Sequence, residues 1–130
     1  MNSYKKPFSH IDLRVPNMDV ALPFYEKLLP ALGFTRTYHS PLWKVFAVEG
    51  QLPSAAYFAI TEDPAHLPNG NLVGFWASER TEVDRIAQLA REAGGKINDG
   101  PRQFPISKSY YAVYFEDPCG NKYEFVHRVD

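Results

Sequence analysis

The stretch YFEDPCGNKYEFV, residues 114–126, indicates two strands joined by a tight turn. The turn is DPCG, residues 117–120, in which Gly120 is free to take a positive φ. Glu124 stands in the middle of the second run, among aromatic and aliphatic residues. Because such strands usually bury one face, this carboxylate needs a metal, a proton partner or water.

The first half of the chain begins with an alternating strand, SHIDLRV, residues 9–15. An amphipathic helix is predicted over about residues 18–31, with Asn17 as its N-cap and Gly33 beyond its end. Two internal prolines favour a kink or an early end of that helix. Strand-like runs follow at residues 35–39, 43–49 and 55–61.

The same order then begins again after a Pro/Gly-containing linker. Residues 71–78 resemble a strand, residues 79–95 a helix closed by two glycines, and the remaining runs up to KYEFVHR three more strands. The repeated order of elements therefore predicts one α+β domain, residues 1–130. It is made of two βαβββ modules (about 8–61 and 71–129) joined by a linker, residues 62–70. We expect the modules to form a curved sheet, a half-barrel around a cavity with the helices outside.

Alternation within residues 9–15 decides which side chains enter the cavity. If the apolar residues of this strand pack on the helices, then His10, Asp12 and Arg14 point into the concavity. Arg14 is the candidate for fixing an anionic substrate group, because guanidinium groups bind carboxylates bidentately. Exposure of all three side chains to water is the alternative.

Aromatic and apolar residues are expected to form the cavity walls. The candidates are Phe58, Leu72, Trp76 and Tyr111, although alternation does not decide between Tyr110 and Tyr111. Such walls with a few polar groups suit a flat or apolar organic ligand. Simple filling of the core is the alternative for each aromatic residue.

Three segments in this order resemble the vicinal oxygen chelate superfamily, which includes glyoxalase I, bleomycin-resistance proteins and extradiol dioxygenases. They are HIDLRVPNMDVALPFYEKLLPALGF, EVDRIAQLAREAGG and YYAVYFEDPCGNKYEFV, and together they cover most of the chain. The resemblance implies four metal-ligand positions, a His or Gln in each first strand and a Glu or other ligand in each fourth strand. Those positions are His10, Phe58, Leu72 and Glu124, of which only His10 and Glu124 are able to bind metal.

The incomplete ligand set leaves two functions open. One is a small enzyme of lyase, isomerase or dioxygenase type, in which His10 and Glu124 act as catalytic acid and base or hold one divalent ion (Zn, Ni, Mn or Fe). The absence of a second histidine at the expected position argues against extradiol cleavage. The other is a metal-free protein that binds or sequesters a small organic molecule, as bleomycin-resistance proteins do.

Composition narrows the partners. The formal charge of −1 with no Lys/Arg cluster disfavours nucleic acid and acidic membranes. No apolar run approaches a membrane span, and the N-terminal residues lack a signal-peptide core, so a cytoplasmic location is expected. The single cysteine, Cys119, excludes an intrachain disulfide. A homodimer is predicted, because the sheet edges of two modules need cover.

Overall fold

The computed structural model describes residues 7–50 and 55–130. The first module contains a strand, a helix and three further strands in the predicted order. Its elements are β1 (His10–Val15), α1 (Met18–Ala31), β2 (Arg36–Ser40), β3 (Trp43–Ala47) and β4 (Tyr57–Glu62).

The second module repeats that order after the linker. Its elements are β5 (Leu72–Trp76), α2 (Arg80–Glu92), β6 (Lys96–Gln103), β7 (Tyr111–Glu116) and β8 (Lys122–His127). The predicted α+β fold of two βαβββ modules is therefore confirmed.

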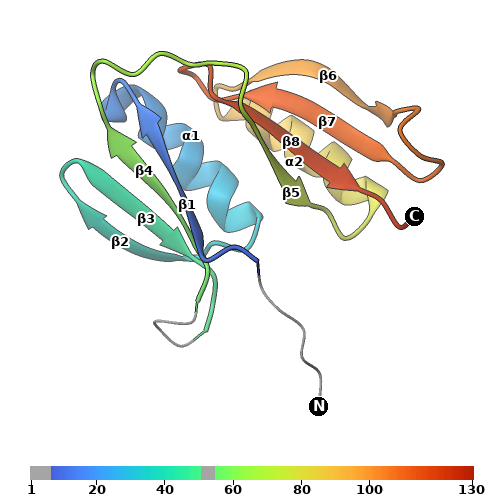
Figure 1. The fold of residues 1–130 in the computed structure, drawn as a ribbon, viewed down its shortest axis with the longest axis horizontal. Coiled ribbons are helices and arrows are strands. Elements are labelled where there is room, and N and C mark those ends of the chain that lie inside the picture. Colours follow the sequence, from blue (N-terminus) through green and yellow to red (C-terminus); the bar gives the residue numbers. More distant parts are fainter. Residues whose placement is uncertain (1–6, 51–54) are drawn as a thin grey trace.

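The strands form two four-stranded sheets, ordered β1-β4-β3-β2 and β5-β8-β7-β6. In each sheet the first and last strands of the module pair in parallel, and the other neighbours are antiparallel. Figure 1 shows both helices on one side of the sheets and the opposite faces uncovered. The concave surface thus consists of two separate sheet faces, with β1 and β5 at the edges that face each other.

Helix α1 forms where the sequence predicts it. The Asn17 side chain accepts a hydrogen bond from the Val20 N–H, which satisfies one of the free donors of the first turn. The helix continues through Pro23 and Pro30, so neither proline ends it early. Its apolar stripe is buried against both modules, which makes α1 the centre of the core.

The turn at residues 117–120 is tied to α1 by a buried polar network. Asp117 accepts hydrogen bonds from the Tyr25 hydroxyl at 2.5 Å and from the backbone N–H of Asn121 at 2.9 Å. The Tyr25 hydroxyl also lies 2.6 Å from that of Tyr123. Gly120 has φ +98°, as the turn requires. The β7–β8 hairpin is thereby fixed against the first module.

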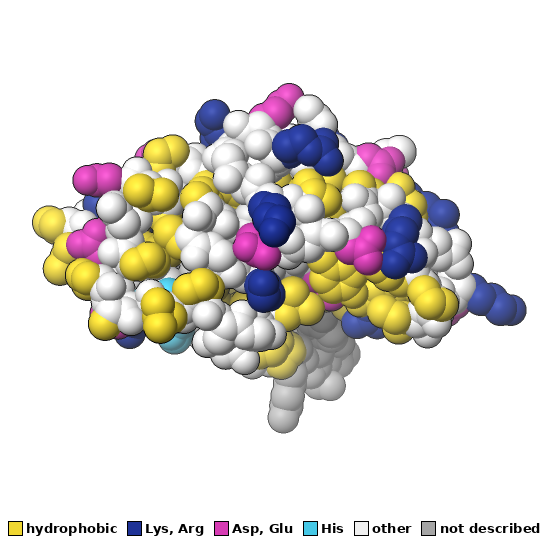
Figure 2. All heavy atoms as spheres, turned by 90° about the horizontal axis from the view of Figure 1, so that it is seen from above, with side chains coloured by type: hydrophobic (Ala, Val, Ile, Leu, Met, Phe, Trp, Pro, Cys, Tyr) yellow, Lys and Arg dark blue, Asp and Glu magenta, His cyan; other side chains and the backbone are white. Residues whose placement is uncertain are grey.

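The surface agrees with the even charge balance of the sequence. Basic and acidic side chains are interspersed over the face seen in Figure 2. No helix of the described residues is long and apolar enough to cross a membrane.

Candidate functional site

The uncovered face of the first sheet carries the three polar residues predicted for it. In β1, His10, Asp12 and Arg14 are exposed, while Ile11 and Leu13 are partly buried against the core. In β5 the exposed residues are likewise every second one, with Trp76 the most exposed at 66%. Alternation along both first strands therefore places these side chains on the helix-free side.

Glu124 lies at the centre of the second sheet, on the same uncovered side. Its neighbours in the ladder are Gly74 on β5 and Tyr114 on β7. Only 7% of its surface is exposed, and its Oε2 atom accepts a hydrogen bond from the Tyr110 hydroxyl. Burial, followed by the hydrogen bond to Glu124, raises the pKa of Tyr110. The hydroxyl therefore stays protonated and keeps donating to the carboxylate.

A hollow of about 200 Å³ opens above this carboxylate, and we call it the Glu124 pocket. Gly74 leaves space there, since a Cβ at this position would lie 3.9 Å from Glu124 Oε1. The Arg128 guanidinium lies over the Trp76 ring, 4.5 Å from its centroid. The lining residues, all from the second module, are Gly74, Phe75, Trp76, Tyr110, Glu124, Val126 and Arg128.

His10 lies in a different hollow. Its ring stacks on Tyr57 with centroids 4.5 Å apart, and its Nδ1 lies 2.9 Å from the Ser9 hydroxyl. The hollow around it, the His10 pocket, has a volume of about 120 Å³ and a mostly aromatic lining that includes Phe34. The His10 pocket and the Glu124 pocket adjoin at Gly74 and Phe75, and neither of the two is lined by both His10 and Glu124.

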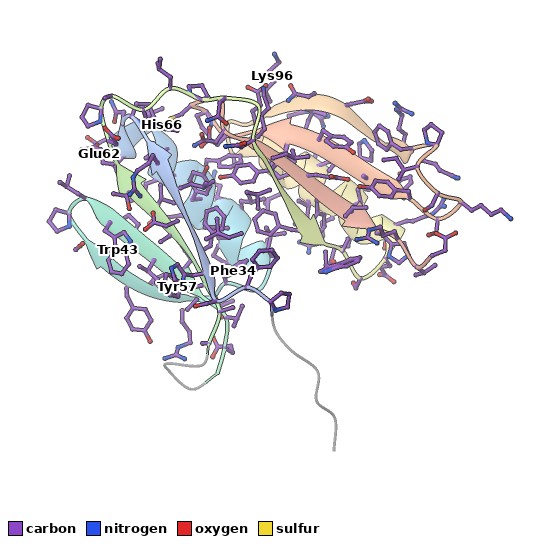
Figure 3. The ribbon with its side chains drawn as sticks, in the orientation of Figure 1. Phe34, Trp43, Tyr57, Glu62, His66 and Lys96 are labelled. Carbon is purple, nitrogen blue, oxygen red and sulfur yellow. The ribbon has the colours of Figure 1, made fainter. Side chains whose placement is uncertain are left out.

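Asp12 organises the uncovered face of the first sheet. It accepts hydrogen bonds from Arg14 at 2.8 Å, from the Thr61 hydroxyl at 2.9 Å and from the Trp43 indole at 3.3 Å. Figure 3 shows Trp43 and Tyr57 on this first sheet, where they line an apolar hollow of about 270 Å³. Arg14, expected to bind an anionic ligand, is thus engaged by a carboxylate of its own strand.

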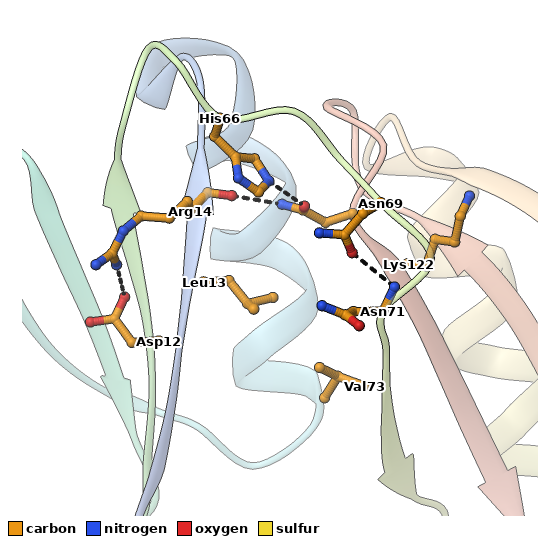
Figure 4. A pocket seen from close by; sticks show the side chains of 9 residues that line it. Asp12, Leu13, Arg14, His66, Asn69, Asn71, Val73 and Lys122 are labelled. Atoms are coloured by element: carbon orange, nitrogen blue, oxygen red, sulfur yellow. Dashed lines mark hydrogen bonds and ion pairs between the residues drawn. The ribbon is translucent and has the colours of Figure 1, made fainter.

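A further hollow of about 160 Å³, the junction pocket, lies where the linker crosses between the modules. His66 Nε2 lies 3.0 Å from Asn121 Oδ1, and Asn121 Nδ2 donates to the Arg14 carbonyl at 2.9 Å. Figure 4 shows Leu13 and Val73 between β1 and β5, with the Arg14 side chain directed to Asp12. Asn121 therefore joins the linker and both modules.

Two residues expected to line the cavity are placed differently from the prediction. Phe58 is 1% exposed and packs on the core side against Tyr25 and Phe75, and it also borders the His10 pocket. Tyr111 lies on the helix side of its sheet, where its hydroxyl donates to Asp84 at 2.6 Å. Tyr110 is the tyrosine that reaches the pocket.

The register corrects the assignment of one ligand position. Glu124 pairs with the third residue of β5, and the residue that pairs with the third residue of β1 is Ala59. Ala59, rather than Phe58, is therefore the counterpart of Glu124 in the first module. Leu72, the counterpart of His10, is half-exposed and has no metal-binding atom.

The residues present do not fit a metal ion held within one chain. Across residues 7–50 and 55–130, no three His, Cys, Asp or Glu side chains gather closely enough to coordinate one. The two retained donors line separate pockets, and two donors fall short of the three or more that protein metal sites generally use.

Sequence reasoning missed Arg128, which follows the last strand and has no periodic pattern to mark it. It also left Tyr110 undecided, since this residue precedes β7 by one position. The aromatic pairing of Arg128 with Trp76 has no sequence spacing that would reveal it.

Known proteins are similar to this chain in sequence or in structure. An uncharacterized protein from Pseudomonas aeruginosa is 31% identical over 121 residues, which are 90% of this chain and 85% of that protein. The crystal structure of a glyoxalase/bleomycin resistance protein from Albidiferax ferrireducens has a TM-score of 0.77 and 28% identity, covering 95% of this chain and all of that one.

A more distant structure shares the fold alone. It is a mutant of the fosfomycin resistance protein FosX from Listeria monocytogenes, complexed with Mn(II) and 1S,2S-dihydroxypropylphosphonic acid. Its TM-score is 0.67 at 20% identity, covering 97% of this chain and 90% of that one.

The family model of the glyoxalase/bleomycin resistance protein/dioxygenase superfamily matches residues 8–125. The chain belongs to this superfamily.

Proposed function

We propose that this protein binds a small organic molecule in the Glu124 pocket without the help of a metal ion. The observation that carries the proposal is the separation of His10 from Glu124, together with the apolar residues Ala59 and Leu72 at the other two ligand positions. A distant FosX structure was solved with Mn(II). In this chain only two of the four expected ligand positions, His10 and Glu124, carry metal-binding atoms.

The chemistry of the pocket supports a ligand with both a planar part and a polar hydrogen. Trp76 offers an exposed ring as a wall. Glu124 offers carboxylate oxygens at the base of the pocket, and Gly74 leaves the space beside Oε1 open. A hydroxyl or N–H of the ligand would be accepted by Glu124, as the hydroxyl of Tyr110 already is.

The test combines metal analysis with ligand screening. Protein purified without chelator is expected to contain far less than one metal ion per chain, and added Mn²⁺, Zn²⁺, Ni²⁺ or Fe²⁺ is expected to leave its melting temperature unchanged. Small aromatic molecules that bind the native state raise that temperature. Glu124→Gln should abolish this rise, whereas His10→Ala, in the other pocket, should retain it. Stoichiometric metal lost in both variants would overturn the proposal and favour the metalloenzyme.

The hydrogen bond between Tyr110 and Glu124 favours a second candidate, an acid–base enzyme. A positioned carboxylate can remove a proton from a bound substrate, and the protonated tyrosine beside it can return one. Exchange of an acidic C–H of a bound ligand with D₂O, followed by NMR, separates the two functions. The enzyme would lose exchange in Glu124→Gln and slow it in Tyr110→Phe, while a pure binding protein would show no catalysed exchange.

Homodimer formation and a cytoplasmic location, both expected from the sequence, remain predictions. The mass in solution tests the first, and a monomeric mass would contradict it. A second chain placed against the uncovered faces would also add walls to the shallow pockets found within one chain.

A further inference from the structure

The Glu124 pocket is lined by a cationic side chain, Arg128, that forms no ion pair with an acidic group of residues 7–50 and 55–130. The ion pairs of the described residues involve Arg14, Arg85, Arg102 and Lys122 as cations, and Arg128 takes part in none of them. Its guanidinium carbon instead lies over the Trp76 ring, 4.5 Å from the ring centroid. This cation–π contact positions the guanidinium at the pocket and leaves its N–H donors available there.

The opposite chemistry lies at the base of the same pocket. Glu124 is held there by Tyr110, and its charge contributes, after burial, to the raised pKa of Tyr114. One hollow thus combines a carboxylate acceptor, a guanidinium donor and an aromatic wall. Its volume of about 200 Å³ limits the ligand to a small molecule.

We propose that the ligand of this pocket is a small aromatic hydroxy acid, whose acid group pairs with Arg128 and whose hydroxyl donates to Glu124. This inference rests on the proposed function. Guanidinium groups form two parallel hydrogen bonds with a carboxylate, which fixes the orientation of the acid. An acid without a hydroxyl has no hydrogen-bond donor for Glu124 and is repelled by its negative charge. A simple amine is repelled by the positive charge of Arg128. The ring of the ligand packs beside Trp76.

The experiment measures binding of defined probes by isothermal titration calorimetry. 4-Hydroxybenzoate and mandelate contain a ring, an acid and a hydroxyl, benzoate lacks the hydroxyl, and phenol and benzyl alcohol lack the acid. We expect at least one hydroxy acid to bind ten-fold or more tightly than its incomplete analogues. Arg128→Gln should weaken the binding of that ligand about ten-fold or more. Arg128→Lys should restore part of the lost affinity, because lysine keeps the positive charge but lacks the two parallel N–H donors of the guanidinium.

Arg91→Gln is the matched control, because Arg91 lies on α2 and its side chain bonds only to Gln88 of the same helix within the described structure. It should leave binding unchanged. Equal binding by wild type and Arg128→Gln, or tighter binding of phenol and benzyl alcohol than of the acids, would overturn the inference and leave the proposed function standing. If neither these probes nor a wider aromatic library binds, the proposed function falls as well.

Discussion

Alkaline pH is expected to destabilise the protein through two tyrosines of the core. Tyr25 and Tyr123 are both fully buried, and their hydroxyls lie 2.6 Å apart. Burial first, and the negative charge of Asp117 in addition, raises the pKa of each well above its ordinary value. Ionising either hydroxyl in the folded protein would place a second negative charge beside a buried carboxylate.

The magnitude follows from proton linkage. An unfolded tyrosine titrates near pH 10, so below that pH both states keep their protons and the full stability is present. Above it the unfolded state loses protons that the folded state retains, and unfolding is favoured as the pH rises towards the folded-state pKa. Each tyrosine then lowers the free energy of unfolding by about 1.4 kcal/mol per pH unit, or about 2.7 kcal/mol for the two.

Urea unfolding of wild type and Tyr25→Phe between pH 8 and pH 11 measures this effect. At pH 8 the variant should be less stable by about 1.5–3 kcal/mol, because it loses a hydrogen bond to a buried carboxylate. Above pH 10 its slope should be shallower by up to about 1.4 kcal/mol per pH unit, since one titrating group is gone. Tyr38→Phe, on the exposed face of β2, is the control. Parallel wild-type and Tyr25→Phe curves above pH 10 would refute the reasoning.

Three further substitutions test the pocket and the core. Gly74→Val should fill the space beside Glu124 and weaken ligand binding ten-fold or more in calorimetry. The free energy of unfolding should stay equal or rise by up to about 1 kcal/mol. An unchanged affinity would contradict the pocket assignment. Gly95→Ala should cost about 1–3 kcal/mol in urea unfolding, because its Cβ would lie 2.6 Å from a ring carbon of Phe24 and 2.7 Å from the Glu116 carbonyl oxygen. A neutral effect would contradict the close packing of the backbone at this position. Phe58→Ala should cost about 3–5 kcal/mol and leave metal content and ligand preference unchanged, whereas a selective loss of binding would return Phe58 to the site.

Local patterns predicted the elements well because each depends on neighbours in the sequence. The alternation in β1 identified the exposed face correctly, since successive strand residues point to opposite sides. The capping Asn17 and the apolar stripe gave the helix Met18–Ala31 at its observed bounds. The repeat of this order gave the two modules and their fold.

Patterns within a single segment could not predict the strand register or the relative placement of the two modules, because both depend on contacts between residues far apart in the sequence. The face of Phe58 depends on how β4 pairs with β1, a contact between residues 47 positions apart in the pair Ile11–Phe58. The choice between Tyr110 and Tyr111 depends on where β7 begins, and a shift of one residue reverses the face. The separation of His10 from Glu124 depends on how the two sheets are placed by the shared core, which no alternation within a strand describes.

The two modules carry complementary halves of the expected ligand pattern. The first has His10 in its first strand and Ala59 in its fourth, while the second has Leu72 in its first strand and Glu124 in its fourth. A buried carboxylate without a metal still needs donors, and Tyr110 supplies one. A purely structural role would be satisfied by that contact. It would not require the open space at Gly74, nor Arg128 on the same hollow, which pairs with no acidic group in the described part of the chain. These two features favour retention of Glu124 for a ligand.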